Sequence, residues 1–117
     1  MSRYRALLVS AGSYQDPKLG QLRSTATDAE ALAHVLLDRS ISKFEVIQLI
    51  DQPAQSIRIA LEEFFSDSYN DTLLLYFSCH GLKDQDGELV FATSDTQWKN
   101  LRATGIEARW ILSLIHI

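Results

Sequence analysis

Short apolar runs alternate along the chain with segments whose apolar residues recur every three or four positions. The runs at residues 6–9, 44–50 and 73–77 are rich in leucine, valine and isoleucine, which predicts strands. Two segments between them carry helical apolar stripes, which consist of Ala29, Leu32, Ala33 and Leu36 in the first and Ile57, Ala60, Leu61 and Phe64 in the second. The order predicts an α/β domain with a parallel sheet and right-handed crossovers.

Local signals give the expected beginnings of the helices. Thr27 and Glu30 have capping-box spacing, so the first helix is predicted to begin at Thr27, with a beginning near Ser24 as the alternative. Pro53 is suited to the first turn of the second helix.

The last third of the chain predicts a hairpin and another helix. Asp86-Gly87 is a strong turn signal before a short strand at residues 88–92. Thr104 and Glu107 again have capping-box spacing and predict a third helix.

The strand at residues 73–77 is the most apolar and is expected to be central, buried on both faces. Catalytic groups in parallel sheets gather beyond the carboxyl ends of the strands. That placement brings His80, which follows this strand, to the same edge of the sheet as Asp28.

Composition narrows the class of protein. The chain has 117 residues, 46% of them hydrophobic and 22% charged, which predicts one domain over residues 1–117. The net charge of −4 gives no electrostatic signal for nucleic-acid binding and argues against binding to an anionic membrane. The one cysteine, Cys79, excludes an internal disulfide and favours a reducing, cytoplasmic location.

Four segments in the same order resemble the caspase-like cysteine peptidases, in particular metacaspases and bacterial effector-associated caspases. Residues 5–14 are similar to the first strand of that family, and Leu22-Arg23 followed by Asp28-Ala29 is similar to the beginning of its first helix. The sequence Ser-Cys-His-Gly at residues 78–81 resembles its histidine motif, and residues 87–96 its following hairpin. The resemblance implies a three-layer sandwich with a mainly parallel sheet.

The resemblance assigns roles to two adjacent residues. His80 matches the histidine that holds the proton of the cysteine nucleophile and passes it to the leaving amine. Gly81 matches the residue whose backbone N–H binds the oxyanion. The simpler interpretation of His80 is a hydrogen-bonded histidine at a strand end.

The same resemblance implies a substrate pocket for arginine or lysine. Asp28 matches an acidic residue that pairs with a basic side chain, and Ser78 matches a residue lining that pocket. A helix-capping aspartate is the competing interpretation of Asp28, since a first-turn carboxylate complements the helix dipole. Arg23 raises the possibility of cleavage after aspartate, but the Leu-Arg spacing favours the metacaspase pattern.

The nucleophile of the family is not recognised in the sequence. Cys79 adjoins His80, but successive strand residues point to opposite faces, so Cys79 is expected to be a small buried thiol. We therefore expect a partial domain, ending before the strand that carries the nucleophile and inactive by itself. Calcium is a candidate cofactor with Asp95 as a candidate ligand, whereas Asp84, Asp86 and Glu88 are expected to form a solvated turn.

Two other functions stay open. The first is a non-catalytic caspase-like module for regulation or assembly. For the peptidase and for this module we expect peptide or protein partners and consider a fused C-terminal sensor or effector-associated domain. The second is an unrelated flavodoxin-like domain that binds a nucleotide at the loop of residues 10–13.

Overall fold

The computed structural model of the protein describes residues 3–66 and 70–115, which form an α/β fold. The elements in chain order are β1 (Tyr4–Ser10), α1 (Thr25–Leu37), β2 (Phe44–Ile50), α2 (Ala54–Phe65), β3 (Thr72–Ser78), β4 (Gly81–Lys83), β5 (Leu89–Phe91), the 3-10 helix η1 (Trp98–Asn100), α3 (Leu101–Thr104), β6 (Ile106–Glu107) and α4 (Ala108–Leu114). The three predicted parallel strands and the two helices between them are confirmed.

The first sheet is parallel and has the order β2-β1-β3, so β1 is its central strand. Tyr4 lies opposite Phe44 on one side and Thr72 on the other. The prediction that the strand at residues 73–77 is central is therefore wrong for the described residues, among which β3 has β1 as its one neighbour. The run of leucines predicts a strand but not its position in the sheet, because the run in β1 is equally apolar.

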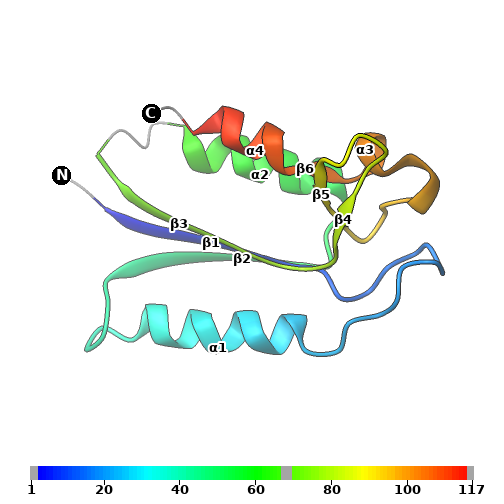
Figure 1. Ribbon diagram of the computed structural model, residues 1–117. Coiled ribbons are helices and arrows are strands. Elements are labelled where there is room, and N and C mark those ends of the chain that lie inside the picture. The colour runs from blue at the N-terminus through cyan, green and yellow to red at the C-terminus, as the bar shows by residue number, and fades with distance from the viewer. Residues whose placement is uncertain (1–2, 67–69, 116–117) are drawn as a thin grey trace.

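Figure 1 shows three layers, with α1 on one face of the first sheet and α2 and α4 on the other. Side chains of β1 alternate between the two faces, as expected for a strand. Ala6 and Leu8 pack in the cluster beneath α1, while Leu7 and Val9 pack with α2 and α4. The predicted three-layer sandwich is confirmed by this arrangement.

A second, antiparallel sheet of β4, β5 and β6 follows the carboxyl end of β3 (Figure 1). The hairpin between β4 and β5 turns at Gly87, whose φ of 79° is readily adopted by glycine. The Asp84 carbonyl accepts a hydrogen bond from the Gly87 N–H at 3.0 Å. The turn predicted from Asp86-Gly87 is confirmed.

The helix beginnings differ in part from the capping patterns. α1 begins at Thr25 after Ser24, so the alternative beginning is confirmed and the capping box at Thr27 is wrong. The Ser24 carbonyl accepts from the Asp28 N–H at 2.8 Å, which starts the helical bonding before Thr27 reaches a capping position. α2 begins at Ala54, directly after Pro53.

The third predicted helix is confirmed as α4, but the capping box at Thr104 is wrong, because α3 ends at Thr104 and α4 begins at Ala108. A Cβ added to Gly105 would lie 2.4 Å from Cγ1 of Val90, so the chain there passes too close to β5 for a side chain. This close approach separates the two short helices. Among the described residues, no helix has the length and apolar character that crossing a lipid bilayer requires.

Candidate active site

His80 lies where the chain leaves the first sheet and enters the second. β3 ends at Ser78 and β4 begins at Gly81. The His80 N–H donates to the Tyr14 hydroxyl at 3.1 Å, and the His80 carbonyl accepts from the Ala92 N–H at 2.9 Å. Both backbone groups of His80 are therefore fixed, one by the loop after β1 and the other by the end of β5.

The imidazole of His80 is held by the loop between β1 and α1. Its Nε2 lies 2.6 Å from the Gly20 carbonyl oxygen. A carbonyl oxygen only accepts hydrogen bonds, so Nε2 carries a proton in this contact. In the neutral ring Nδ1 is then the basic nitrogen with a lone pair. The Tyr14 ring packs against the imidazole with centroids 5.0 Å apart and planes inclined by 41°.

The loop that carries Tyr14 and Gly20 is braced at its base. The Asp51 carboxylate at the end of β2 accepts from the Gly12 N–H at 2.8 Å and the Ser13 N–H at 3.0 Å. The Leu22 N–H closes the loop by donating to the Gly12 carbonyl at 2.8 Å. A Cβ on Gly12 would lie 2.3 Å from the Leu22 oxygen, so this close approach requires glycine.

The same contacts argue against the nucleotide-binding alternative. A phosphate bound at residues 10–13 needs free backbone N–H groups. The N–H groups of Gly12 and Ser13 instead both donate to the Asp51 carboxylate. An anion supplied by the chain itself therefore occupies the place that a phosphate would take.

The N–H of Gly81 points away from β5. In an antiparallel pair, residues opposite each other alternate between hydrogen-bonded and non-hydrogen-bonded positions. The bonds from Ala92 N–H to His80 O and from Asp84 N–H to Glu88 O fix this alternation. Gly81 lies opposite Phe91 between them, in a non-hydrogen-bonded position. Its N–H is thus directed to the outer edge of β4, next to His80.

The predicted pocket residues lie at one end of the molecule. Ser78 is opposite Ser10 in the sheet, and both share the alternation that turns Ala6 towards α1. Ser10 is 1% exposed, and its hydroxyl makes no hydrogen bond with the described residues. Asp28 is exposed in the first turn of α1, which begins at the end of the sheet where β1 and β3 stop (Figure 1). Between the described residues, no hydrogen bond or ion pair joins Asp28 to His80 or Ser78.

Cys79 belongs to a small apolar cluster and not to a dyad with His80. It packs against buried Ala11, Tyr14 and Ala92. Burial raises the pKa of its thiol to about 11. The contacts of the His80 ring are to Gly20 and Tyr14, and in the described part of the chain no hydrogen bond joins it to Cys79. A thiol that stays protonated near neutral pH is a poor nucleophile.

Asp95, the weak calcium candidate, is engaged in hydrogen bonds within the protein. Its Oδ1 accepts from the Ala54 N–H at 2.9 Å, at the beginning of α2, and from the Thr93 hydroxyl at 2.8 Å. Within residues 3–66 and 70–115, no group of three or more His, Cys, Asp or Glu side chains is placed to hold a metal ion. Calcium binding stays a prediction without an assigned site.

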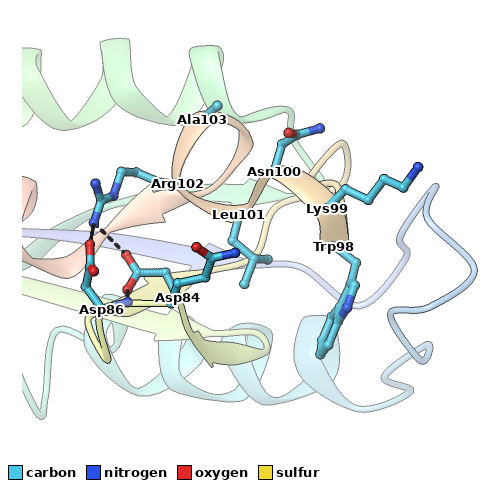
Figure 2. Close-up of a pocket in the computed structure, with 9 residues that line it drawn as sticks. Asp84, Asp86, Trp98, Lys99, Asn100, Leu101, Arg102 and Ala103 are labelled. Atoms are coloured by element: carbon cyan, nitrogen blue, oxygen red, sulfur yellow. Dashed lines mark hydrogen bonds and ion pairs between the residues drawn. The ribbon is translucent and has the colours of Figure 1, made fainter.

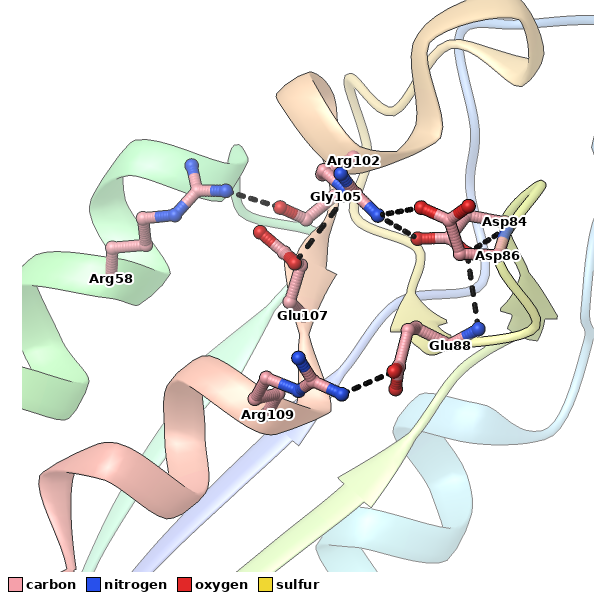
Figure 3. Close-up of polar contacts among 8 residues, drawn as sticks. All are labelled: Arg58, Asp84, Asp86, Glu88, Arg102, Gly105, Glu107 and Arg109. Carbon is pink, nitrogen blue, oxygen red and sulfur yellow. Dashed lines mark hydrogen bonds and ion pairs between the residues drawn. The ribbon is translucent and has the colours of Figure 1, made fainter.

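The acidic turn between β4 and β5 is paired with arginines. Figure 2 shows the carboxylates of Asp84 and Asp86 converging on Arg102, at 3.2 Å and 2.7 Å. Figure 3 adds the pair of Glu88 with Arg109 on α4. The prediction of a merely solvated turn is thus incomplete, since ion pairs join the turn to α3 and α4.

A pocket of about 360 Å³ lies between this turn and the segment of residues 98–103 (Figure 2).

Sequence reasoning missed three residues that hold the histidine in place: Tyr14, Gly20 and Asp51. Tyr14 contacts His80 through its hydroxyl, and Gly20 contacts it through its main-chain carbonyl. Neither contact is marked by a sequence motif. Asp51 has a φ of 52°, and its position after a strand was the one available signal for a turn.

One comparison with known proteins identifies a family. The family model described as the caspase domain matches residues 3–114. A search of curated proteins finds no match.

Proposed function

The chain belongs to the caspase-domain family of peptidases, and we propose that it supplies the histidine, the oxyanion amide and the substrate pocket of a cysteine endopeptidase. The family implies peptide or protein substrates. The contact of 2.6 Å between Nε2 of His80 and the Gly20 carbonyl carries the proposal. Because this contact places the proton of the neutral ring on Nε2, Nδ1 has a free lone pair that accepts the proton of a thiol.

The proposed reaction needs a cysteine thiol next to Nδ1 of His80. The thiol gives its proton to Nδ1, and the sulfur attacks the peptide carbonyl carbon. The carbonyl oxygen becomes an oxyanion, which the outward N–H of Gly81 stabilises. The imidazolium then gives the proton to the leaving amine as the carbon–nitrogen bond breaks, and water later hydrolyses the thioester.

We propose that the thiol in this reaction is not Cys79, and that the chain alone does not cleave peptides. Cys79 is the one cysteine of the sequence, and its pKa of about 11 keeps it protonated. The test is an assay of the purified 117-residue chain with fluorogenic arginine, lysine and aspartate peptides. No turnover is expected. Cleavage after arginine that His80→Ala abolishes and Cys79→Ala removes as well contradicts this part of the proposal.

Arginine or lysine is the proposed residue before the scissile bond. Asp28 is exposed at the beginning of α1, at the end of the sheet that also holds the half-buried Ser78. A carboxylate and hydroxyl oxygens are suitable acceptors for a guanidinium.

A titration followed by NMR tests the pocket without requiring turnover. Acetyl-arginine methylamide is expected to shift the amide signals of Asp28 and Ser78, whereas acetyl-aspartate methylamide leaves them unchanged. Asp28→Asn is expected to weaken the arginine response. Preferential binding of the aspartate ligand, lost on Arg23→Gln, contradicts the assignment.

The second candidate is a non-catalytic caspase-like module. It is favoured by one observation: within the described residues, no hydrogen bond joins the thiol of Cys79, the one cysteine of the sequence, to the His80 ring, and burial raises the pKa of this thiol. Adding the chain to a catalytically complete caspase-domain protein distinguishes the two functions. A concentration-dependent change in the rate of that protein, unaffected by His80→Ala, supports the module.

A further inference from the structure

The hydroxyl of Tyr14 stands in the place of a hydrogen bond of the parallel sheet. At the end of β1, the Ala11 N–H donates to the Ser78 carbonyl at 2.9 Å. In a parallel ladder, a residue that donates to one partner accepts from the residue two positions further along. The next expected bond therefore runs from the His80 N–H to the Ala11 carbonyl. The Tyr14 hydroxyl lies between these two groups instead, 2.5 Å from the Ala11 oxygen and 3.1 Å from the His80 nitrogen.

The direction of both bonds follows from their chemistry. The Ala11 carbonyl only accepts, so the hydroxyl proton of Tyr14 points to it. The oxygen lone pair of Tyr14 then accepts the N–H of His80. Tyr14 is 6% exposed, and burial raises its pKa to about 12, so the hydroxyl keeps its proton near neutral pH.

The remainder of Tyr14 is equally constrained. Its backbone N–H donates to Oε1 of Gln21, and its carbonyl accepts from Nε2 of Gln21, each at 3.0 Å. Its ring lies against the His80 imidazole, whose Nε2 contacts the carbonyl of Gly20, the residue before Gln21. One loop thus holds the main chain, the ring face and one ring nitrogen of His80.

We propose that Tyr14 is a positioning residue for His80: its hydroxyl separates the ends of β1 and β3 while fixing the histidine main chain, and its ring directs the imidazole to Gly20. A direct ladder bond would keep His80 in line with β1. The inserted hydroxyl widens that gap by one oxygen atom and lets the chain turn into β4. For catalysis, the proposal rests on the proposed peptidase function, whereas the positioning itself requires only the fold.

The experiment compares Tyr14→Phe with Tyr76→Phe in the purified 117-residue chain. Tyr76 lies in the same sheet and packs beneath α1, so its variant is the matched control for loss of a tyrosine hydroxyl. Amide hydrogen exchange at His80 is expected to accelerate by about fivefold to tenfold in Tyr14→Phe, which corresponds to one lost hydrogen bond. Exchange at Leu82, in the ladder of β4 and β5, serves as the internal reference.

Long-range ¹H–¹⁵N spectra of the His80 ring supply the readout that a general loss of stability does not move. Tyr14→Leu removes the ring as well as the hydroxyl, so the fraction of the Nε2–H tautomer is expected to fall in Tyr14→Leu and to stay constant in Tyr14→Phe and Tyr76→Phe. An unchanged ratio of His80 to Leu82 exchange in Tyr14→Phe, or an unchanged tautomer in Tyr14→Leu, overturns the proposal.

A measurement on the unmodified chain tests the position of Tyr14 if Tyr14→Phe does not fold. A nuclear Overhauser effect between the Tyr14 hydroxyl proton and the His80 amide proton is expected, and its absence overturns the proposal. None of these three readouts depends on peptidase activity. A chain with the expected positioning but a His80 that never serves as a base would contradict the proposed function and leave the role of Tyr14 intact.

Discussion

The body of the sheet and its carboxyl edge are built by different forces. In the body, alternate side chains of β1 are buried beneath α1 on one face and beneath α2 and α4 on the other. At the edge, the loop after β1 and the hairpin of β4 and β5 are held by individual hydrogen bonds and ion pairs, through residues such as Tyr14, Asp51, Asp95 and Arg102.

Because the two regions are held by different forces, substitutions in them are expected to have different effects. Apolar burial is spread over many side chains, so any one of them is replaceable by a residue of similar size. Each polar contact at the edge has a specific geometry and fixes one neighbour, such as His80. Changes in the body are therefore expected to affect mainly folding, changes in the loop after β1 mainly the position of the histidine, and changes in the other polar contacts of the edge a smaller share of stability.

The largest expected effect is in the body of the sheet. Leu61 is fully buried on α2, and Leu61→Ala is expected to lower the free energy of unfolding by about 2–5 kcal/mol, because it removes apolar contacts and leaves a cavity. Ile59→Ala on the same helix is the control, since Ile59 is 50% exposed. Denaturant titration measures both. Equal losses in the two variants contradict the distinction between buried and exposed faces.

The next effect concerns the apolar cluster at the edge. With its pKa raised to about 11, the Cys79 thiol has about 100-fold less thiolate near neutral pH than a thiol with a pKa of about 9. Alkylation by iodoacetamide is expected to be slower by about that factor in the folded chain than in the chain unfolded by urea. Equal rates would show a reactive thiol and reopen its pairing with His80.

A smaller effect is expected from the contact between the hairpin end and α2. Asp95→Ala removes the acceptor of the Ala54 N–H and is expected to lower the free energy of unfolding by about 0.5–2 kcal/mol, as for the loss of a helix cap. Asp95→Asn keeps an oxygen that accepts from Ala54 and is the matched control. Denaturant titration in which Asn is as unstable as Ala contradicts the capping role.

The smallest effect is the pH dependence of the acidic turn. Hydrogen bonds from the Glu88 N–H and from Arg102 hold the pKa of Asp84 below its usual range. A lowered folded pKa stabilises the protein above the unfolded pKa of about 3.9, and this contribution is lost as the pH falls through the folded pKa. Asp84→Asn is therefore expected to lower Tm near pH 7, with the difference shrinking below about pH 4.

The exposed Glu30 supplies the control for this pH dependence. Glu30→Gln is expected to leave Tm nearly unchanged both near pH 7 and below about pH 4. A difference between Asp84→Asn and the wild type that grows towards acidic pH contradicts the assigned sign.

The body of the fold was predictable because apolar periodicity records burial. The pattern gave β2 its bounds and identified the stripe of α2, in which Ile57, Leu61 and Phe64 are buried. It did not give the strand order, since β1 and β3 are similarly apolar. Capping-box spacing misplaced two helix beginnings, because a Thr and a Glu three positions apart also occur inside a helix or across a break such as Gly105.

The candidate histidine was identified from the resemblance, and its catalytic role stays a prediction, whereas its surroundings could not be identified from the sequence. His80 and Gly81 belong to a local motif, whereas Tyr14 and Gly20 contact His80 from 66 and 60 positions away. A hydroxyl that bridges two main-chain groups and a carbonyl that accepts from a ring nitrogen follow from tertiary structure. Neither requires a distinctive residue pattern in the sequence.

The tautomer of His80 in the unmodified 117-residue chain tests the central claim most directly. Long-range ¹H–¹⁵N NMR at neutral pH reports which ring nitrogen carries the proton, and His80→Ala assigns the signals against His34 and His116. The contact with the Gly20 carbonyl predicts that the neutral form of the ring carries its proton on Nε2 and a lone pair on Nδ1. A proton resident on Nδ1, or an equal mixture of the two tautomers, contradicts the account.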